Sequence, residues 1–220
     1  MMECGAGWGP WIGAGYGAAR QLGIETIRVI GVEGHEQKVV AMAQHFEDNG
    51  ASPEEVCAIH GLVAAESGIA LFPVAADPSM HWGARKLGRV GTDHAKLLAE
   101  VRAVPFEGRP GVYSVGKRNL PYNLVPSYSL LELMGDHELI DYIHFDIQGS
   151  EREVIETTIE AMNARVRVIF VGTHSGEIEA ALRVLLPAND WHCAYDTPQW
   201  PKPVGVPGDG SQVWLNRRFF

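Results

Sequence analysis

The stretch Glu3-Cys-Gly-Ala-Gly-Trp-Gly9 decides how the first part of this chain folds. Residues 1–4 are predicted to end a strand, and the glycines at positions 5, 7 and 9 are too closely spaced to extend it. Glycines at such spacing let the backbone turn tightly and pass close to a ligand. Pro10 suits the first position of a helix, because its missing N–H would be unpaired there in any case. We therefore predict a strand end, a tight loop and a helix over residues 10–22.

Apolar patterning predicts that strands and helices alternate along the rest of the chain. Residues 26–33 are a nearly continuous β-branched apolar run, as expected of a strand covered on both faces. Helical spacing follows over residues 35–49. This alternation favours an α/β fold with a doubly wound, mostly parallel sheet of about seven strands and helices on both faces. Further strands are expected at 56–64, 69–74, 140–147, 166–172, 191–195 and 212–216, and further helices at 127–134, 150–163 and 175–186.

The 220 residues are enough for one domain with its own core, and we expect a single domain over residues 1–220. Residues 76–120 show no clear period and are expected to form an irregular insertion with at most one helix, near 93–102. A connection of this length is usually a functional lid or a binding loop. The first strand has few residues before the glycines, against a usual length of roughly five or six, so we expect it to be truncated.

Composition argues against several classes of protein. The formal net charge is −9, and no local cluster of Lys and Arg is expected to offset it, which disfavours nucleic-acid binding. Three widely separated cysteines favour neither a disulfide framework nor a zinc site and fit a reducing compartment. No apolar run approaches the ~20 residues of a membrane helix, and no signal segment opens the chain. We therefore predict a cytoplasmic protein without membrane contact.

The glycine loop predicts a cofactor site. A dinucleotide fingerprint G-x-G-x-x-G would need glycine at position 10, where Pro10 stands. The spacing E-x-G-x-G-x-G instead fits S-adenosylmethionine (SAM), and Glu33, at the end of the next strand, is placed to accept both ribose hydroxyls. The alternative is that the glycines only form a turn and that Glu33 only caps the next helix. The expected cofactor-binding residues of these two segments are Glu3, Gly5, Ala6, Gly7, Trp8, Gly9, Glu33 and Gly34.

A second set of polar residues follows two later strands. Asp146 lies near the end of one predicted strand, and His174 directly follows another. Ligands bind at the carboxyl edge of a doubly wound sheet, so Glu33, Asp146 and His174 are expected to face one crevice. Either Asp146 or His174 could accept a proton from a substrate hydroxyl. His144 alternates with Asp146 and suggests a metal site with His174, but a metal needs three or more converging ligands, and we predict none.

Five stretches of the chain, within about residues 1–190, resemble the FkbM-type SAM-dependent methyltransferases. The pattern D-x-E/Q-G-x-E that ends at Glu151 is the most specific, whereas many methyltransferases share the glycine loop. The resemblance implies a Rossmann-like methyltransferase fold, SAM as the methyl donor, and O-methylation of a hydroxyl on a sugar, lipid-like or secondary-metabolite acceptor. The stretches are Glu3-Cys-Gly-Ala-Gly-Trp-Gly-Pro-Trp11, Val29-Ile-Gly-Val-Glu33, Ile59-His-Gly-Leu-Val-Ala64, Asp141-Tyr-Ile-His-Phe-Asp-Ile-Gln-Gly-Ser-Glu151 and Phe170-Val-Gly-Thr-His-Ser175.

The resemblance also implies further site residues. Asp146, Gln148 and Glu151 match the second motif of the family, whose division between cofactor and acceptor stays open at this point. Asp146 and Gln148 are expected to contact the cofactor, and Glu151 is a candidate contact with the acceptor. Trp82 and Arg85 lie in the insertion and are candidates for closing over the acceptor. A small hydroxylated molecule is the partner that this arrangement implies.

The segment that flanks adenine in such enzymes matches residues 60–63, so Gly61 and Leu62 are expected to contact the cofactor. Many related enzymes carry an acid there, and this chain has none. The contact with the adenine amino group is therefore expected from the backbone.

Two alternative functions stay open at this point. A catalytically degenerate methyltransferase-fold binding protein is slightly favoured by the missing acid. An NAD(P)-linked oxidoreductase is disfavoured by Pro10.

Overall fold

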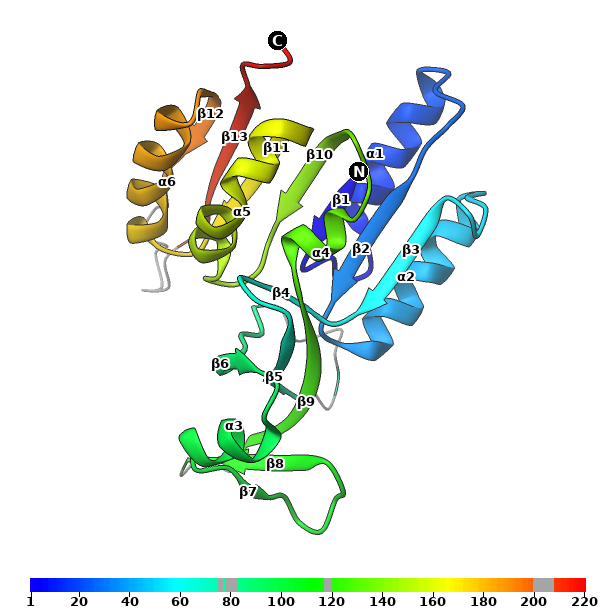
Figure 1. The fold of residues 1–220 in the computed structure, drawn as a ribbon. Helices are drawn as coiled ribbons and strands as arrows, with labels where there is room; N and C mark the ends of the chain where they lie inside the picture. Colours follow the sequence, from blue (N-terminus) through cyan, green and yellow to red (C-terminus); the bar gives the residue numbers. More distant parts are fainter. Residues whose placement is uncertain (75–76, 78–82, 117–119, 200–207) are drawn as a thin grey trace.

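The computed structural model describes residues 1–74, 77, 83–116, 120–199 and 208–220. These residues form a large sheet between two layers of helices, with a smaller sheet attached at one edge (Figure 1). The large sheet carries the site described below, and the smaller sheet closes over it.

The large sheet has seven strands in the order β12-β13-β11-β10-β1-β2-β3. Neighbouring strands are parallel, except that β13 runs antiparallel to both β11 and β12. The predicted α/β fold with a mostly parallel sheet of about seven strands is therefore confirmed. The strands are β1 (Met2–Cys4), β2 (Val29–Glu33), β3 (Val56–His60), β10 (Ile140–Phe145), β11 (Val166–Thr173), β12 (Trp191–Thr197) and β13 (Gly210–Asn216).

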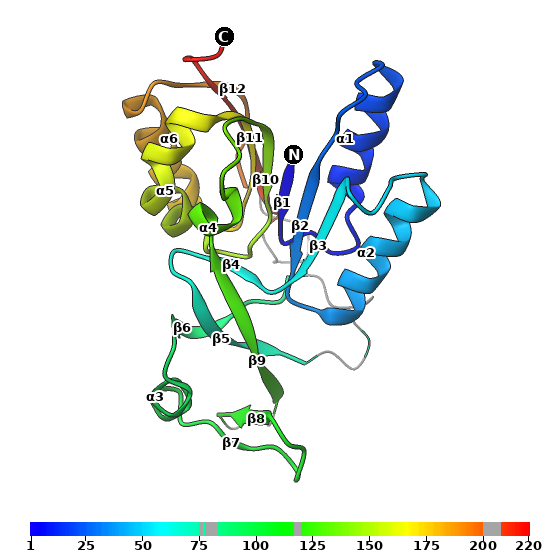
Figure 2. The same ribbon diagram turned by 45° about the vertical axis from the view of Figure 1, so that its right-hand side comes forward.

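Helices cover both faces of this sheet, as Figure 2 shows from the side. One face carries α1 (Pro10–Gln21) and α2 (Glu36–Asp48), and the other carries α4 (Leu130–Met134), α5 (Glu151–Arg165) and α6 (Gly176–Ala188). No helix in the described part of the chain is long and apolar enough to cross a membrane.

Each helical layer buries its own set of apolar side chains against the sheet. Full burial of one large aliphatic or aromatic side chain stabilises a fold by roughly 1.5–3 kcal/mol, so these two layers hold the sheet together. The cluster under α1 and α2 includes Ile12, Tyr16, Val29, Met42 and Phe46. The larger cluster under α4, α5 and α6 includes Leu130, Ile143, Val154, Ile169, Leu182 and Trp214.

The prediction that the segment of residues 76–120 is irregular is wrong, because three strands of a second sheet lie wholly within it. The strand order is β6-β5-β9-β8-β7, its neighbours are antiparallel, and β4 adds to β9 in parallel. Only the helix expected near 93–102 is confirmed, as α3 (His94–Glu100). The strands are β4 (Leu62–Ala64), β5 (Gly68–Pro73), β6 (Leu87–Gly91), β7 (Val104–Pro105), β8 (Val112–Val115) and β9 (Leu120–Ser129).

The strand predicted over residues 56–64 is divided by Gly61. Its first half, β3, pairs with β2 in the large sheet, whereas its second half, β4, pairs with β9 in the small one. A Cβ atom on Gly61 would lie 2.5 Å from the ring of Tyr128, so only glycine allows the chain to pass from one sheet to the other here. The strand predicted at 69–74 likewise belongs to the small sheet, as β5.

The helix predicted over residues 127–134 begins later than expected. Ser127 belongs to β9, where it pairs with Gly68 across the small sheet. Ser129 caps α4 instead, and its hydroxyl accepts a hydrogen bond from the N–H of Glu132 at 3.1 Å. Strand pairing thus overrides the apolar pattern that placed residues 127–129 in the helix, whereas the helix ends at Met134 as predicted.

Candidate functional site

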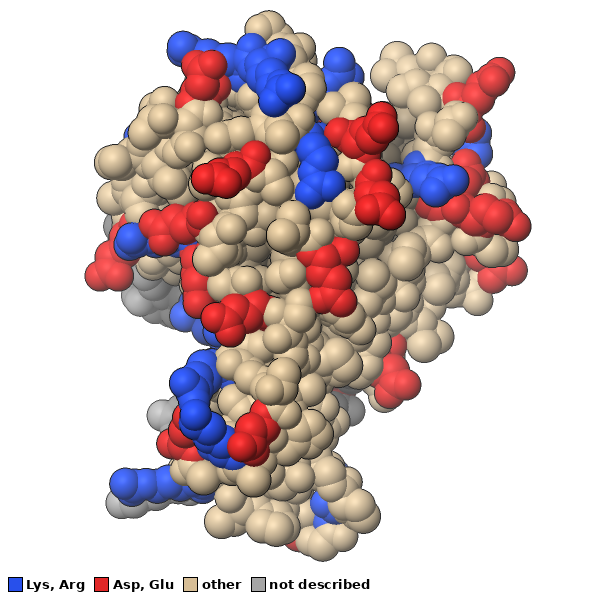
Figure 3. All heavy atoms as spheres, in the orientation of Figure 1, with Lys and Arg blue, Asp and Glu red and all other residues tan. Residues whose placement is uncertain are grey.

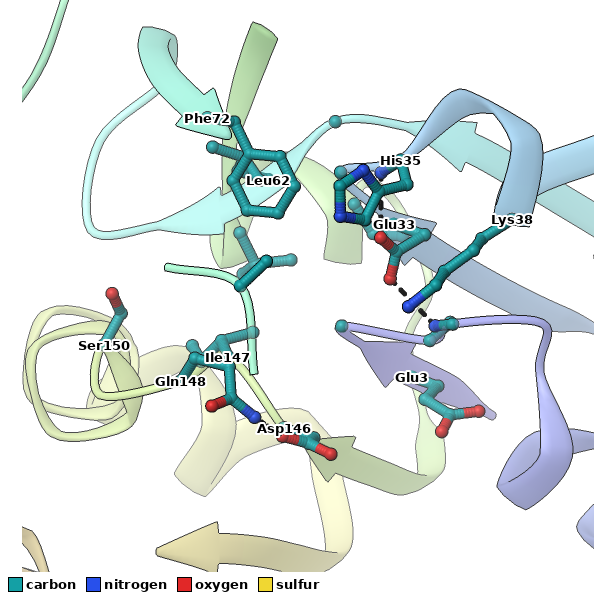
Figure 4. Close-up of a pocket in the computed structure, with 18 of the residues that line it drawn as sticks. Glu3, Glu33, His35, Lys38, Leu62, Phe72, Asp146, Ile147, Gln148 and Ser150 are labelled. Atoms are coloured by element: carbon teal, nitrogen blue, oxygen red, sulfur yellow. Dashed lines mark hydrogen bonds between the residues drawn. The ribbon is translucent and has the colours of Figure 1, made fainter. Parts of the chain in front are cut away.

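A pocket lies at the carboxyl edge of the large sheet (Figure 4). At this edge β1, β2, β3 and β10 end and the small sheet begins (Figure 1). Ten of the twelve residues predicted to bind the cofactor line this pocket. They are Glu3, Gly5, Ala6, Gly7, Glu33, Gly34, Gly61, Leu62, Asp146 and Gln148.

The glycine loop after β1 forms one wall of the pocket. The N–H groups of Gly5 and Ala6 both donate to the carbonyl of Val32 at 2.9 Å, which fastens the loop to β2. Gly5 has a φ of +80° and Gly7 a φ of +57°, a region that favours glycine. A Cβ atom on Gly5 would lie 1.9 Å from the carbonyl oxygen of Asp146. The loop therefore fits between β2 and β10 because Gly5 has no side chain.

Glu33 is fixed at the end of β2 by two backbone groups. Its Oε2 accepts from the N–H of Gly7 at 2.9 Å, and its Oε1 accepts from the N–H of His35 at 2.8 Å (Figure 4). The carboxylate is only 7% exposed. Each carboxylate oxygen has two acceptor directions, so one direction on each oxygen remains for a ligand. Glu33 thus joins the glycine loop to the start of α2 and presents two acceptors to the pocket.

Glu3 lines the same pocket, but protein groups engage both of its oxygens. Oε2 accepts from the N–H of Ile12 at 3.1 Å, and Oε1 lies 3.0 Å from Nδ1 of His144. Glu3 is 1% exposed. These contacts tie the first turn of α1 to β1 and β10, so its part in cofactor binding stays a prediction.

Asp146 lies across the pocket from Glu33, at the end of β10. Its Oδ1 accepts from Nε2 of Gln148 at 2.7 Å and lies 3.1 Å from Nε2 of His174. The other nitrogen of His174, Nδ1, lies 2.7 Å from Oε1 of Glu151. Asp146, His174 and Glu151 therefore form one hydrogen-bonded row in which the histidine is the middle member.

The charges within this row follow from its geometry. Burial alone would lower the pKa of His174, but its hydrogen bonds with Asp146 and Glu151 outweigh burial and raise that pKa to about 9. Burial acts to raise the pKa of Asp146, but its hydrogen bond with His174 and the charge of the ring bring it below the ordinary value. The row consequently holds an imidazolium ion that is hydrogen-bonded to the ionised Asp146 at neutral pH.

This arrangement distinguishes the two predicted proton acceptors. The protonated ring of His174 donates from both nitrogens and has no lone pair left for a substrate proton. Among the described residues, no donor contacts Oδ2 of Asp146, and this side chain lines the pocket. The geometry favours Asp146 over His174 as the group that takes a proton.

Glu151 lies beneath the pocket wall and is fully buried. Its Oε1 accepts from the N–H of Ile147 at 3.0 Å, and its Oε2 accepts from the N–H of Gly149 at 3.0 Å. Gln148 and Gly149 have φ angles of +54° and +107°. Glu151 thereby holds the turn after Asp146 in shape, whereas its predicted contact with an acceptor remains a prediction.

The other predicted residues occupy different places. Trp8 packs edge-on against His45, with ring centroids 4.8 Å apart, and Gly9 forms the N-cap of α1. Arg85 lies at the turn after Asp146, since a Cβ atom on Gly149 would be 3.9 Å from its guanidinium. Trp82 lies outside the described residues.

The structure adds lining residues that the sequence did not indicate. Phe72 on β5 reaches the pocket from the small sheet, beside Leu62, and its ring lies 4.9 Å from that of His35 (Figure 4). Lys38 and Lys86 also line the pocket. Phe72 was missed because β5 was expected in the large sheet, far from this edge. No spacing signal marked Lys86, which lies in the aperiodic insertion.

The order of the strands explains why the pocket lies here. The chain runs from β1 to β2 and β3 on one side of the sheet, and from β10 to β11 on the other. The direction of winding changes between β1 and β10, where Gly5 and Asp146 meet, and open α/β sheets bind ligands at such a switch point. The fold and the site together define a Rossmann-like α/β protein.

Comparison with known proteins agrees with this class. No protein-family model matches the sequence. A curated protein of Jannaschia sp. (strain CCS1), named "Putative methyltransferase", is 28% identical over 198 residues, which cover 90% of this chain. This chain spans 64% of the length of that relative.

Solved structures of methyltransferases are also similar. Methyltransferase FkbM from Methylobacillus flagellatus KT matches with a TM-score of 0.51 and 12% identity, over 98% of this chain and 42% of that one. An rRNA methylase from Streptococcus thermophilus matches with a TM-score of 0.43 and 12% identity, over 97% of this chain and 84% of that one. The likeness to FkbM shows that this chain has the Rossmann-like methyltransferase fold that the sequence resemblance implied.

Proposed function

We propose that this chain is a SAM-dependent methyltransferase that methylates a hydroxyl oxygen of a small acceptor, such as a sugar, a lipid-like molecule or a secondary metabolite. The name of the curated relative and the fold of FkbM support methyl transfer. One observation carries the proposal: the fixed carboxylate of Glu33 lies beside the glycine loop at the switch point of the sheet.

The residues of the pocket suit the parts of SAM. Glu33 has one free acceptor direction on each oxygen, which matches the two adjacent hydroxyls of a ribose. Leu62, Phe72 and the ring of His35 offer an apolar wall for the adenine. The backbone of Gly5 and Gly7 can approach the amino-acid tail closely, because neither residue has a side chain.

Bound SAM would supply an activated methyl group, so the protein needs mainly to position the acceptor. We assign the proton of the acceptor hydroxyl to Oδ2 of Asp146. Gln148 and His174 fix the other oxygen of this carboxylate and thereby orient it. A hydroxyl oxygen becomes strongly acidic as it gains a methyl group, so a carboxylate with a lowered pKa still takes its proton.

We assign His174 a positioning role. It was one of two candidates for the catalytic base, and we assign that role to Asp146. Its charge pairs with Asp146 and Glu151 and keeps the first of these ionised. Three further statements remain proposals from composition. They are that the acceptor is a small molecule, that the protein has no nucleic-acid or membrane partner, and that it is cytoplasmic.

Titration calorimetry with SAM and with NAD tests this function directly. We expect SAM to bind and NAD not to bind. Preference for NAD would support the oxidoreductase alternative. Screening of hydroxylated compounds with methyl-labelled SAM then tests transfer, and SAM binding without transfer to any of them would support a degenerate binding protein.

A further inference from the structure

Residues 68–129, from the start of β5 to the end of β9, differ in charge from the rest of the chain. They contain eight Lys and Arg residues and four Asp and Glu residues. The whole chain contains 18 Lys and Arg residues and 27 Asp and Glu residues. Figure 3 shows Lys and Arg side chains along the lobe that the small sheet forms. The expectation that no local group of basic residues offsets the net charge is therefore wrong for this segment. An anion is attracted to this lobe and repelled by the rest of the molecule.

Residues 83–86 bring this positive charge to the pocket. A Cβ atom on Gly83 would lie 3.2 Å from Oε1 of Gln148, and one on Gly149 would lie 3.9 Å from the Arg85 guanidinium. The segment thus runs along the turn that follows Asp146. Lys86, the next residue, lines the pocket itself. Arg85 consequently lies at the turn that follows the proposed proton acceptor, and Lys86 lines the same pocket as that acceptor.

Neither of these cations is neutralised within the part of the chain that the structure describes. Arg85 and Lys86 form no hydrogen bond or ion pair with a described residue, whereas Arg89, a few residues later, pairs with Glu100. An ammonium group offers three donors, and a guanidinium binds a phosphate in a bidentate manner. These two side chains are therefore available to an anionic ligand.

Lys86 also lines a second hollow, between the small sheet and α5. The lining of that hollow includes the carboxylates of Glu66 and Glu153, which would repel an anion. Lys86 therefore stands at a wall that the two hollows share.

We infer that the acceptor is a small hydroxylated molecule that carries a phosphate group, and that Arg85 and Lys86 hold this phosphate while the hydroxyl lies at Asp146. This inference rests on the proposed methyl transfer and names its acceptor class. A nucleic acid is less suited, because it requires a continuous track of free cations, and Arg89 is already paired.

Inorganic pyrophosphate is the probe that tests this inference. It is titrated into protein saturated with S-adenosylhomocysteine, which keeps the cofactor part of the pocket filled. We expect millimolar binding to the wild type and binding at least about fivefold weaker in Lys86→Gln and in Arg85→Gln. Lys96→Gln removes the same charge from an exposed position on α3 and should bind like the wild type. No binding to the wild type, or an equal loss in this control, overturns the inference.

Two further measurements separate this inference from the proposed function. Lys86→Gln should bind SAM like the wild type, and a clear loss of SAM affinity would mean that Lys86 holds the cofactor, so the inference would fail while methyl transfer stands. A wild type that does not bind SAM would instead refute the proposed function. A short single-stranded RNA that displaces pyrophosphate at micromolar concentration would overturn the small-molecule acceptor.

Discussion

The Nδ1 atom of His174 lies 2.7 Å from Oε1 of Glu151, although 23 residues separate the two along the chain. The Nε2 atom of the same ring lies 3.1 Å from Oδ1 of Asp146. Only a protonated imidazole can donate to both carboxylates at once. The His174 side chain is 3% exposed, so the structure keeps a positive charge inside the protein, in contact with both Asp146 and Glu151.

This buried imidazolium predicts a pH dependence of stability. The pKa of His174 is about 9 in the folded protein against an ordinary 6.5. A raised pKa stabilises the folded state fully below the unfolded value, and that stabilisation is lost as the pH rises from about 6.5 through 9. The expected loss is on the order of 3 kcal/mol. Urea unfolding of the wild type and of His174→Gln between pH 6 and 9.5 measures it, and equal pH dependence in both proteins would contradict the prediction.

Asp146→Asn tests the proposed proton acceptor. The amide cannot take a proton from the acceptor hydroxyl, so we expect kcat to fall roughly 100-fold or more. Its oxygen can still accept hydrogen bonds from Gln148 and His174, so SAM should bind within about threefold of the wild type. Single-turnover transfer from labelled SAM, measured beside calorimetry, separates the two effects.

Asp141→Asn is the matched control for this prediction. It makes the same chemical change on β10, the strand that Asp146 follows, at an exposed position that pairs with Arg167 on the surface. Its turnover should equal that of the wild type. Unchanged turnover in Asp146→Asn would remove Asp146 as the base.

Glu33→Ala tests the cofactor contact. Hydrogen bonds to a charged group contribute roughly 1.5–3 kcal/mol each, so the loss of two should weaken SAM binding at least about 100-fold. Because Glu33 also holds Gly7 and His35, the melting temperature of each variant is measured alongside calorimetry. Glu33→Gln keeps one acceptor oxygen and should lose less affinity. Glu47→Ala, on the exposed face of α2, should bind SAM normally, and wild-type affinity in Glu33→Ala would end the ribose assignment.

The sequence predicted the large sheet well, because its strands are apolar on both faces and end at glycine or acidic residues. The elements from β1 to α2 lie within a few residues of their predicted bounds. Glu33 and Asp146 line one pocket as expected, whereas His174 is not among the residues that line it. Local patterns sufficed there, since each strand and helix makes its main contacts with its neighbours in the chain.

The small sheet was not predictable in the same way. Its strands pair across distant parts of the sequence, as Gly68 with Ser127, and many of their residues are half-exposed, which weakens the apolar alternation. The charge state of His174 also depends on Glu151, which only the tertiary fold brings to it. The excess of Lys and Arg over Asp and Glu in residues 68–129, by contrast, is a property of the sequence itself.

Gly5→Ala tests how closely the glycine loop packs at the switch point. An alanine here must adopt a φ of +80°, and its Cβ atom would meet the carbonyl oxygen of Asp146 at 1.9 Å. The left-handed conformation alone costs roughly 1–2 kcal/mol, and the displaced carbonyl adds to it. We expect the free energy of unfolding to fall by at least about 2 kcal/mol. Denaturant unfolding measures this value, and calorimetry should show weaker SAM binding, because the loop and Asp146 move apart.

Gly17→Ala is the matched control, because it makes the same chemical change in the interior of α1. Nothing lies within 4 Å of a Cβ atom built there, and the backbone is helical. Alanine loses less conformational freedom than glycine in a helix, so this variant should gain about 0.5–1 kcal/mol of stability. If Gly5→Ala lowers the free energy of unfolding and Gly17→Ala raises it, the effect at Gly5 comes from its contact with the chain after β10. A Gly5→Ala protein as stable as Gly17→Ala would mean that the loop does not need glycine at this position.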